Sequence, residues 1–259
     1  MVRLGAVNYL NVRPLVYGLD GQPDISLRFD VPAECARLLD AGAIDLGMVP
    51  SITFLDRPGD RIVPGLCIGS DGPVASVALF ARKPMRDVAT IALDTSSRTS
   101  AALVRVLCRR AFDIAPTFVP HRPDLASMLA AADAALLIGD PALFLELPSG
   151  VEKIDLGAAW TDMTGLPFVW AFWSGRPEAA DTHVVRVLQD AAKDGASHLD
   201  EIARAYVADA PVRELLATRY LRENLMFRLT PRAIDGLRTY YREAAALGLV
   251  TAAEPVFFA

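Results

Sequence analysis

The chain has 259 residues, 53% of them hydrophobic and 22% charged, so it can bury a sizeable core in one large domain or two of ordinary size. This composition excludes an intrinsically disordered chain. The formal net charge of −5 argues against a nucleic-acid partner, because phosphate binding draws on a basic surface, whereas a small anion can still bind at a helix N-terminus.

The three cysteines and the N-terminus bear on the compartment. Cys35, Cys67 and Cys108 are far apart and lack C-x-x-C spacing, so they predict neither a disulfide framework nor a metal site. Residues 1–8 turn polar too soon for a secretory signal, and no segment approaches a membrane span. We therefore expect a cytoplasmic protein with reduced, packed thiols.

The N-terminal part of the chain alternates short apolar runs with helical patterns, which is typical of βα units and a largely parallel sheet. In chain order the pattern predicts a strand at 2–7, a helix at 11–18, a strand at 25–29, a helix at 32–41 and a strand at 44–49. Two extended segments, residues 62–68 and 74–81, follow on either side of a turn that contains Gly69, Gly72 and Pro73.

The alternation continues through the middle of the chain. Residues 90–93 form an expected strand, and the small polar residues 94–100 then lead into an apolar helix at 101–111, for which they are good N-caps. Further strands are expected at 117–119, 134–138 and 168–173. After Gly175 the pattern predicts helices at 182–207, 212–220 and 231–247.

Two βα blocks followed by a helical tail predict a two-lobed α/β protein with a ligand cleft between the lobes. Residues 1–85 and 174–259 are expected to form a discontinuous first lobe, and residues 86–173 an inserted second lobe. Chain crossings near residues 83–87 and 172–175 would then form the hinge.

Four polar loops follow expected strands, at residues 8–13, 50–53, 70–76 and 95–100. In open α/β sheets, ligands bind beyond the carboxyl ends of the strands. Any single serine or threonine there could simply cap a helix or close a turn. Four such loops together favour a polar pocket.

Individual residues in these loops leave alternatives open. The Asn11 amide could cap the following helix or hydrogen-bond a ligand, and taken alone the residue favours the cap. Arg13 could pair with a carboxylate or lie solvated. Arg98 stands at a helix start, which makes it the better anion-binding candidate, with a plain surface arginine as its rival.

Several common catalytic motifs are missing from the sequence. It has no Walker loop, G-x-G-x-x-G, G-x-S-x-G or H-E-x-x-H pattern. His121, His183 and His198 lie outside the four polar loops. Acid–base chemistry would therefore have to use hydroxyls, carboxylates or the substrate itself.

Six blocks in order along the chain carry a family resemblance: residues 8–15, 45–51, 70–77, 94–100, 138–143 and 164–169. Together they resemble the chorismate dehydratases of the futalosine route to menaquinone. The resemblance implies a type II periplasmic-binding-protein fold that works as an enzyme. Such an enzyme removes water from chorismate, a dianionic small molecule, and leaves 3-[(1-carboxyvinyl)oxy]benzoate without a cofactor or a metal.

The resemblance also implies a set of site residues. Asn11 and Ser76 match positions associated with catalysis. The matching blocks supply the expected substrate-binding residues: Tyr9, Arg13, Ser51, Ser70, Ser97, Arg98, Thr99, Ser100 and Asp140. The helix N-termini after Leu93 and Val49 could receive the two carboxylates together with Arg98 or Arg13. Because the polar loops contain no histidine, the enolpyruvyl carboxylate of the substrate could act as the base.

Three other functions share this fold or composition. A solute-binding protein for a small anion would have the same cleft, but should carry an export signal. The related 1,4-dihydroxy-6-naphthoate synthase family opens with a Ser-Pro-Cys-Pro-type motif where this chain has residues 8–15. An effector-binding domain of a transcription regulator would need an attached DNA-binding module.

Overall fold

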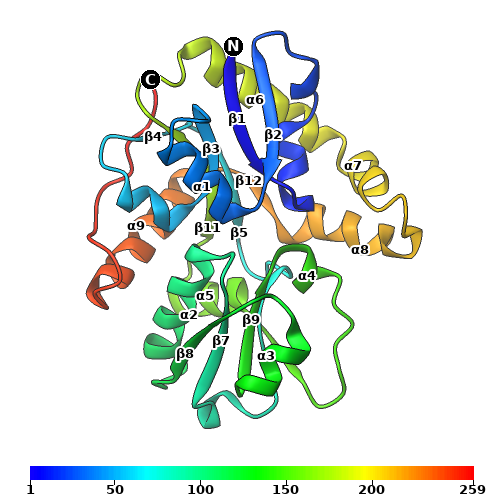
Figure 1. Cartoon of the computed structure of the whole chain (residues 1–259), viewed down its shortest axis with the longest axis vertical. Helices are drawn as coiled ribbons and strands as arrows, with labels where there is room; N and C mark the ends of the chain where they lie inside the picture. Colours follow the sequence, from blue (N-terminus) through cyan, green and yellow to red (C-terminus); the bar gives the residue numbers. More distant parts are fainter.

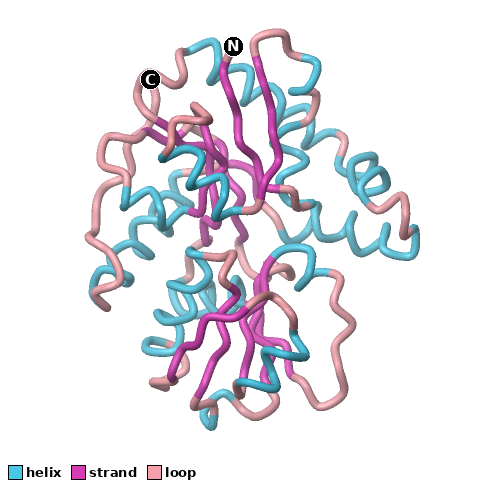
Figure 2. Tube along the Cα trace, in the orientation of Figure 1, coloured by secondary structure: helices cyan, strands magenta, loops and turns pink.

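Two β-sheets, one above the other, organise the chain, and the chain termini both lie at the end of the upper sheet far from the lower one (Figure 1). The computed structural model describes the whole backbone and every side chain except those of residues 32 and 33. Helices flank the strands of both sheets (Figure 2). The mixed α/β architecture predicted from the alternating pattern is confirmed.

The first sheet draws its strands from both ends of the chain. Strand β1 pairs in parallel with β2 and β3, whereas β11 pairs antiparallel with β3, β4 and β5. The order is β12 (Met226–Arg228), β5 (Leu66–Ser70), β11 (Phe168–Gly175), β3 (Leu46–Pro50), β1 (Val2–Val7) and β2 (Ile25–Asp30), with β4 (Arg61–Ile62) beside β11.

The second sheet is built from the middle of the chain. Strand β7 pairs in parallel with β8 and β9, and β6 pairs antiparallel with β9 and β10. The order is β10 (Glu152–Asp155), β6 (Val77–Ala81), β9 (Ala134–Ile138), β7 (Thr90–Asp94) and β8 (Thr117–His121).

The observed strand pairing shows that the chain crosses between the sheets at other residues than expected. Residues 77–81 pair with β9 of the second sheet, so the chain leaves the first sheet within residues 71–76 and not near 83–87. It returns within residues 156–167, because residues 168–175 already pair with β3 and β5. The expected lobe boundaries at residues 85 and 174 differ from these crossings, because the sequence of an apolar strand does not show which sheet the strand joins.

Five of the α-helices begin at a polar cap. The side chains of Ser97, Asp124, Asp155, Asp181 and Thr230 accept hydrogen bonds from backbone N–H groups in the first turns of α2, α3, α5, α6 and α9. The α-helices are α1 (Pro32–Asp40), α2 (Arg98–Arg110), α3 (Leu125–Ala131), α4 (Gly139–Leu143), α5 (Leu156–Thr164), α6 (Thr182–Ser197), α7 (Leu199–Tyr206), α8 (Glu214–Arg219) and α9 (Pro231–Ala246). The 3₁₀ helices are η1 (Leu10–Val16), η2 (Leu19–Gly21), η3 (Ser51–Asp56), η4 (Met85–Asp87) and η5 (Pro211–Arg213), and η6 (Tyr220–Asn224) is a π-helical turn.

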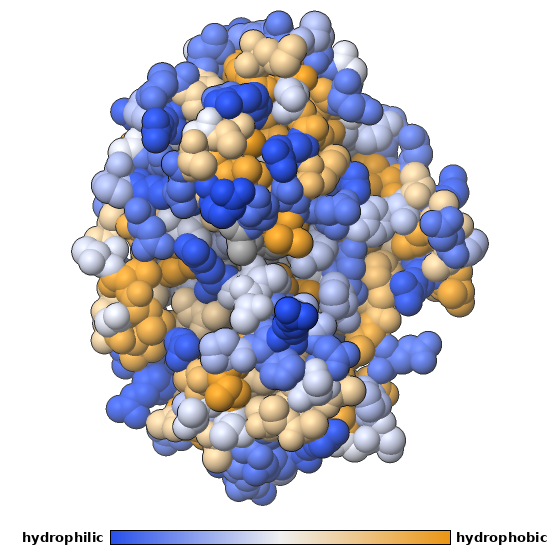
Figure 3. Space-filling view, viewed as in Figure 1, coloured by the Kyte–Doolittle hydropathy of each residue, from blue (hydrophilic) through white to orange (hydrophobic). Residues whose placement is uncertain are grey.

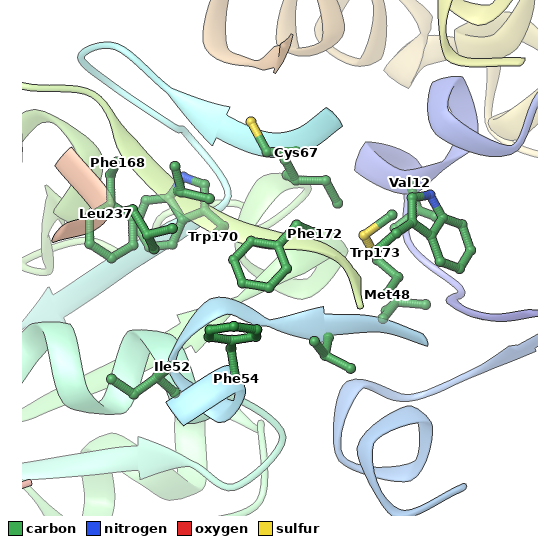
Figure 4. Packing of buried hydrophobic residues seen from close by; sticks show 14 of the residues in the cluster. Val12, Met48, Ile52, Phe54, Cys67, Phe168, Trp170, Phe172, Trp173 and Leu237 are labelled. Atoms are coloured by element: carbon green, nitrogen blue, oxygen red, sulfur yellow. The ribbon is translucent and has the colours of Figure 1, made fainter. Parts of the chain in front are cut away.

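Strand β11 packs against η1 and η3, two short helices that lie beside the site. Phe172 meets Phe54 of η3 edge to face, with ring centroids 5.9 Å apart, whereas Trp173 lies beside Val12 of η1 (Figure 4). A Cβ on Gly195 would lie 2.0 Å from the carbonyl oxygen of Pro14, so helix α6 also packs directly on η1. Close packing from two sides therefore fixes η1.

Apolar side chains reach solvent where α8 projects from the molecule, and Figure 3 shows orange side chains at this end. Val212 is 91% exposed and Leu215 is 80% exposed. Among the helices described, none combines the length and the apolar character that crossing a membrane requires.

Candidate active site

A cavity lies between the two sheets, at the carboxyl ends of β1, β3, β7 and β9. Its empty space, open solvent at the mouth included, is about 610 Å³. Both sheets contribute to its wall: Val7, Tyr9, Asn11, Val12, Met48, Pro50, Ile68, Val74, Trp170 and Ala171 come from the first, and Ser76, Val77, Ser97, Thr99, Ser100, Ile138 and Gly139 come with the second. The wall is thus largely apolar, with a few polar groups.

The Asn11 side chain lines this cavity, and its carbonyl oxygen has no partner among the described residues. Asn11 is the second residue of η1, and the side chain of the capping residue, Tyr9, makes no capping hydrogen bond. The Oδ1 atom of Asn11 is buried and has no hydrogen-bond partner among the described residues. A buried carbonyl oxygen without a donor costs about 1–3 kcal/mol. A ligand that donates a hydrogen bond to Oδ1 would remove that cost. The geometry therefore favours a ligand-binding role for Asn11 over a helix-capping role.

Ser76 is presented by a tight turn ahead of β6. Ala75, just before it, has a φ of +62°, a left-handed conformation that residues other than glycine rarely adopt. The Asp155 carboxylate holds this turn by accepting from the N–H of Val74 at 3.0 Å and from the N–H of Ala75 at 2.6 Å. The same carboxylate caps α5. Ser76 is therefore fixed by backbone contacts as well as by burial.

The Ser76 hydroxyl has one side-chain partner, the phenol of Tyr220, at an oxygen–oxygen distance of 2.7 Å. Both residues are 1% exposed. Burial raises the pKa of Tyr220, and hydrogen bonding with Ser76 and Asn11 opposes that rise. Tyr220 thus stays a neutral phenol behind the cavity wall.

Tyr9 and Gly139 meet across the cavity. Gly139 has a φ of +66°, and a Cβ there would lie 2.8 Å from the Tyr9 ring. Burial is the main cause that raises the pKa of Tyr9, followed by the charge of Asp94. Glycine therefore lets the ring of Tyr9 pack flat against the end of β9.

The first turn of α2 supplies the polar part of the opposite wall. Ser97 accepts from the N–H of Ser100 at 3.2 Å. The hydroxyl of Thr99 accepts from the N–H of Ile52 at 3.3 Å, which links the two sheets. Because the positive end of a helix dipole lies at its N-terminus, this turn favours an anion.

Three expected substrate-binding residues lie behind the wall. Ser51 donates to the carbonyl of Val169 at 2.7 Å, and Ser70 accepts from the indole N–H of Trp170 at 3.2 Å. Asp140 accepts from the N–H of Leu10 at 3.2 Å and from the hydroxyl of Tyr206. Burial raises the pKa of Asp140, and the Tyr206 hydrogen bond opposes this. These side chains position the wall and do not line the cavity.

The two expected arginines also lie outside the cavity lining. Arg13 donates to Oδ1 of Asn8 at 2.5 Å, and its guanidinium carbon lies 4.4 Å from the ring centroid of Phe29. Arg98 is 57% exposed in its side chain and lies 4.0 Å from the carboxylate of Asp56. Among the described lining residues there is no lysine, arginine, histidine, aspartate or glutamate.

No group of three metal-ligating side chains occurs among the described residues. The cysteines are free and buried, and burial raises the pKa of Cys35 and of Cys108 to about 12. A thiol of that kind is a poor nucleophile and a poor metal ligand at neutral pH. The polar side chains that line the described cavity are an amide and hydroxyls, in a wall that is otherwise largely apolar.

The sequence patterns did not identify Tyr220 and Gly139 as parts of the site. Tyr220 lay at the end of an expected helix, with no local signal that it reaches Ser76, 144 residues away. Gly139 follows an expected strand, where a glycine is a usable signal for close backbone approach. Trp170 of β11 both packs in the core and lines the cavity.

Comparison with known proteins gives sequence and structural relatives. A family model described as menaquinone biosynthesis matches residues 2–246. A chorismate dehydratase of Thermus thermophilus is 33% identical over 98% of this chain and 97% of that protein. Among solved structures, a protein of Archaeoglobus fulgidus has a TM-score of 0.77 and 16% identity, and covers 96% of this chain and 98% of its own. The alkanesulfonate-binding protein of Xanthomonas axonopodis pv. citri has a TM-score of 0.68 and 18% identity, with 96% of this chain and 94% of its own covered. The expected periplasmic-binding-type fold is confirmed.

Proposed function

Because this chain belongs to the menaquinone-biosynthesis family, we propose that it is a lyase that dehydrates chorismate to 3-[(1-carboxyvinyl)oxy]benzoate. The observation that carries the proposal is a buried cavity in which the Asn11 carbonyl oxygen has no partner and the Ser76 hydroxyl is held in place. Both groups belong to the blocks that resemble chorismate dehydratases.

The reaction is favourable because it forms an aromatic ring. A proton leaves the ring carbon that bears the enolpyruvyl ether, the neighbouring hydroxyl departs, and together they make one water. The protein then mainly has to orient the substrate and stabilise charge that develops on the departing oxygen. The amide of Asn11 and the hydroxyl of Ser76 are suited to those two tasks.

The described lining residues include no carboxylate or imidazole, so the base comes from the substrate in this proposal. The enolpyruvyl carboxylate takes the ring proton and passes it to the departing hydroxide, which regenerates the carboxylate. A substrate analogue without that carboxylate should not react. Its dehydration at a near-normal rate would rule out this assignment.

The two negative charges of chorismate would be held without an arginine. Arg13 and Arg98 lie outside the lining, whereas the N-terminal turn of α2 faces the cavity with Ser97, Thr99 and Ser100. Backbone N–H groups and the helix dipole bind anions in water-poor sites. We therefore assign one carboxylate to this turn.

We further propose that the two sheets are the cores of two lobes that close on the substrate. The first lobe would contain residues 1–70 and 168–259, and the crossings at 71–76 and 156–167 would be the hinge. Contacts across the cleft support a closed form, since Thr99 meets Ile52 and Asp140 meets Leu10. A cytoplasmic location fits the free, buried cysteines.

Incubation of the purified protein with chorismate, followed by mass spectrometry, tests the proposal. We expect loss of one water per molecule, at the same rate with and without a metal chelator. Tight binding without turnover would identify a solute-binding protein. Activity that disappears on chelation and returns with a divalent ion would contradict the metal-free reaction.

A further inference from the structure

Tyr220 has a buried phenol that the dehydration described above does not use. Its hydroxyl oxygen lies 2.7 Å from Oγ of Ser76, and the two residues are 144 positions apart. Tyr220 belongs to the π-helical turn η6 beside the first sheet, whereas Ser76 precedes β6 of the second sheet. The hydrogen bond therefore joins the two halves of the site from behind the cavity wall.

Packing alone does not require this partner. Tyr240 and Tyr241 are as deeply buried as Tyr220, and their hydroxyls donate to backbone carbonyls, at 2.9 Å and 2.6 Å. Tyr220 instead meets a side-chain hydroxyl of a residue that lines the cavity. In addition, π-helical turns occur often at functional sites.

The direction of the hydrogen bond follows from the available acceptors. Because burial raises the pKa of Tyr220, the phenol keeps its proton and must donate it to an acceptor. Oδ1 of Asn11 has no partner, so it does not receive that proton. Oγ of Ser76 is the acceptor within hydrogen-bonding distance among the described residues. The hydroxyl hydrogen of Ser76 is then left to point elsewhere, and the cavity is the open direction.

We propose that Tyr220 is a positioning residue for the dehydration: its phenol donates to Oγ of Ser76 and thereby turns the Ser76 hydroxyl hydrogen toward the departing hydroxyl of the substrate. The inference rests on the proposed function. Ser76 makes only a hydrogen bond, and the proton that completes the water still comes from the ring carbon by way of the substrate carboxylate. Because charge grows on the departing oxygen as the bond breaks, the donor acts on the transition state more than on binding.

Tyr220→Phe tests the proposal, with Tyr241→Phe as the matched control. Both variants remove one buried phenol hydroxyl and leave the ring in place. We expect Tyr220→Phe to lower kcat for chorismate by about 10- to 100-fold with KM within about threefold. Tyr241→Phe should lower the melting temperature about as much as Tyr220→Phe does, and it should keep kcat within about twofold of the wild-type value. A wild-type kcat in Tyr220→Phe would overturn the proposal.

A double-variant cycle with Ser76→Ala separates positioning from packing. If Tyr220 acts through Ser76, adding Tyr220→Phe to Ser76→Ala should not lower kcat further. Two independent, multiplying losses would overturn the proposal. The double variant should fold even where Tyr220→Phe is unstable, because replacing both hydrogen-bond partners by apolar groups is close to neutral. Wild-type protein that does not dehydrate chorismate would refute the proposed function itself, and that outcome is seen before any variant is measured.

Discussion

Replacing Asn11 by leucine should separate stability from turnover. Leucine has the same branching and the same number of side-chain heavy atoms as asparagine, is larger because of its methyl groups, and carries no carbonyl oxygen that needs a donor. In the structure Oδ1 of Asn11 is buried and has no partner among the described residues. We therefore expect Asn11→Leu to be at least as stable as the wild type and to dehydrate chorismate much more slowly.

The expected magnitudes follow from the environment of the amide. An unpaired buried acceptor costs about 1–3 kcal/mol, and loss of the amide's hydrogen bonding with Tyr220 offsets about 1 kcal/mol of the gain. A net gain of up to about 2 kcal/mol raises the melting temperature by up to about 6 °C in a chain of this size. A hydrogen bond from the Asn11 amide N–H to a substrate carboxylate or to the charge that develops on the departing oxygen is worth about 1.5–3 kcal/mol, so kcat/KM should fall roughly 10- to 150-fold.

Thermal unfolding and steady-state kinetics on the same samples provide the assay. Asn8→Leu is the control, because Asn8 is exposed, lies outside the cavity lining and should keep full turnover. Asn11→Asp is a second variant that could still cap a helix but sets a carboxylate against an anionic substrate. A destabilised Asn11→Leu protein with normal turnover, or a fully active Asn11→Asp protein, would refute the ligand-binding role of Asn11.

Three other predictions concern single substitutions. Gly139→Ala should raise KM severalfold, because a φ of +66° strains alanine and its Cβ would lie 2.8 Å from the Tyr9 ring. An unchanged KM would contradict a role of this close approach in substrate binding. Asp133→Asn should lower the free energy of unfolding at pH 7 by about 1–2 kcal/mol, since a lysine ammonium and two N–H groups hold the pKa of Asp133 at about 2. Because the pKa of Asp133 is depressed in the folded state, this stability is present above pH ~4 and is lost as the pH falls through about 2. Denaturation at several pH values should therefore show that the free energies of unfolding of the wild type and of Asp133→Asn become equal at low pH. Arg98→Ala should leave KM within about threefold, because Arg98 is outside the lining, and a tenfold rise would place it on the substrate.

The fold could be predicted because its signals are local. Most expected strand ends combine an apolar run with a small polar or glycine stop, as at Asp94 to Ser97, where the serine does cap α2. The crossings between sheets could not be predicted in the same way. Residues 77–81 are apolar enough for either sheet, and only pairing with β9 assigns them.

The loops that form the candidate site could be predicted from the sequence, but the side chains of those loops that line the cavity could not. Asn11, Ser76 and the first turn of α2 line the cavity, as the polar loops suggested. Ser51 and Ser70 follow strands of the same kind, yet their hydroxyls bond to the wall, to Val169 and Trp170. Sequence shows which residues reach a strand end, whereas tertiary packing decides which side of the wall they occupy.

The absence of cationic side chains among the described lining residues has an evolutionary consequence. If main-chain N–H groups of α2 bind the substrate carboxylate, only a substitution by proline can delete those donors, since every other residue supplies one. Arg13 and Arg98 are then free to drift. Related chains with different surface charges can retain the same ligand as long as the first turn of this helix keeps its place and its serine cap.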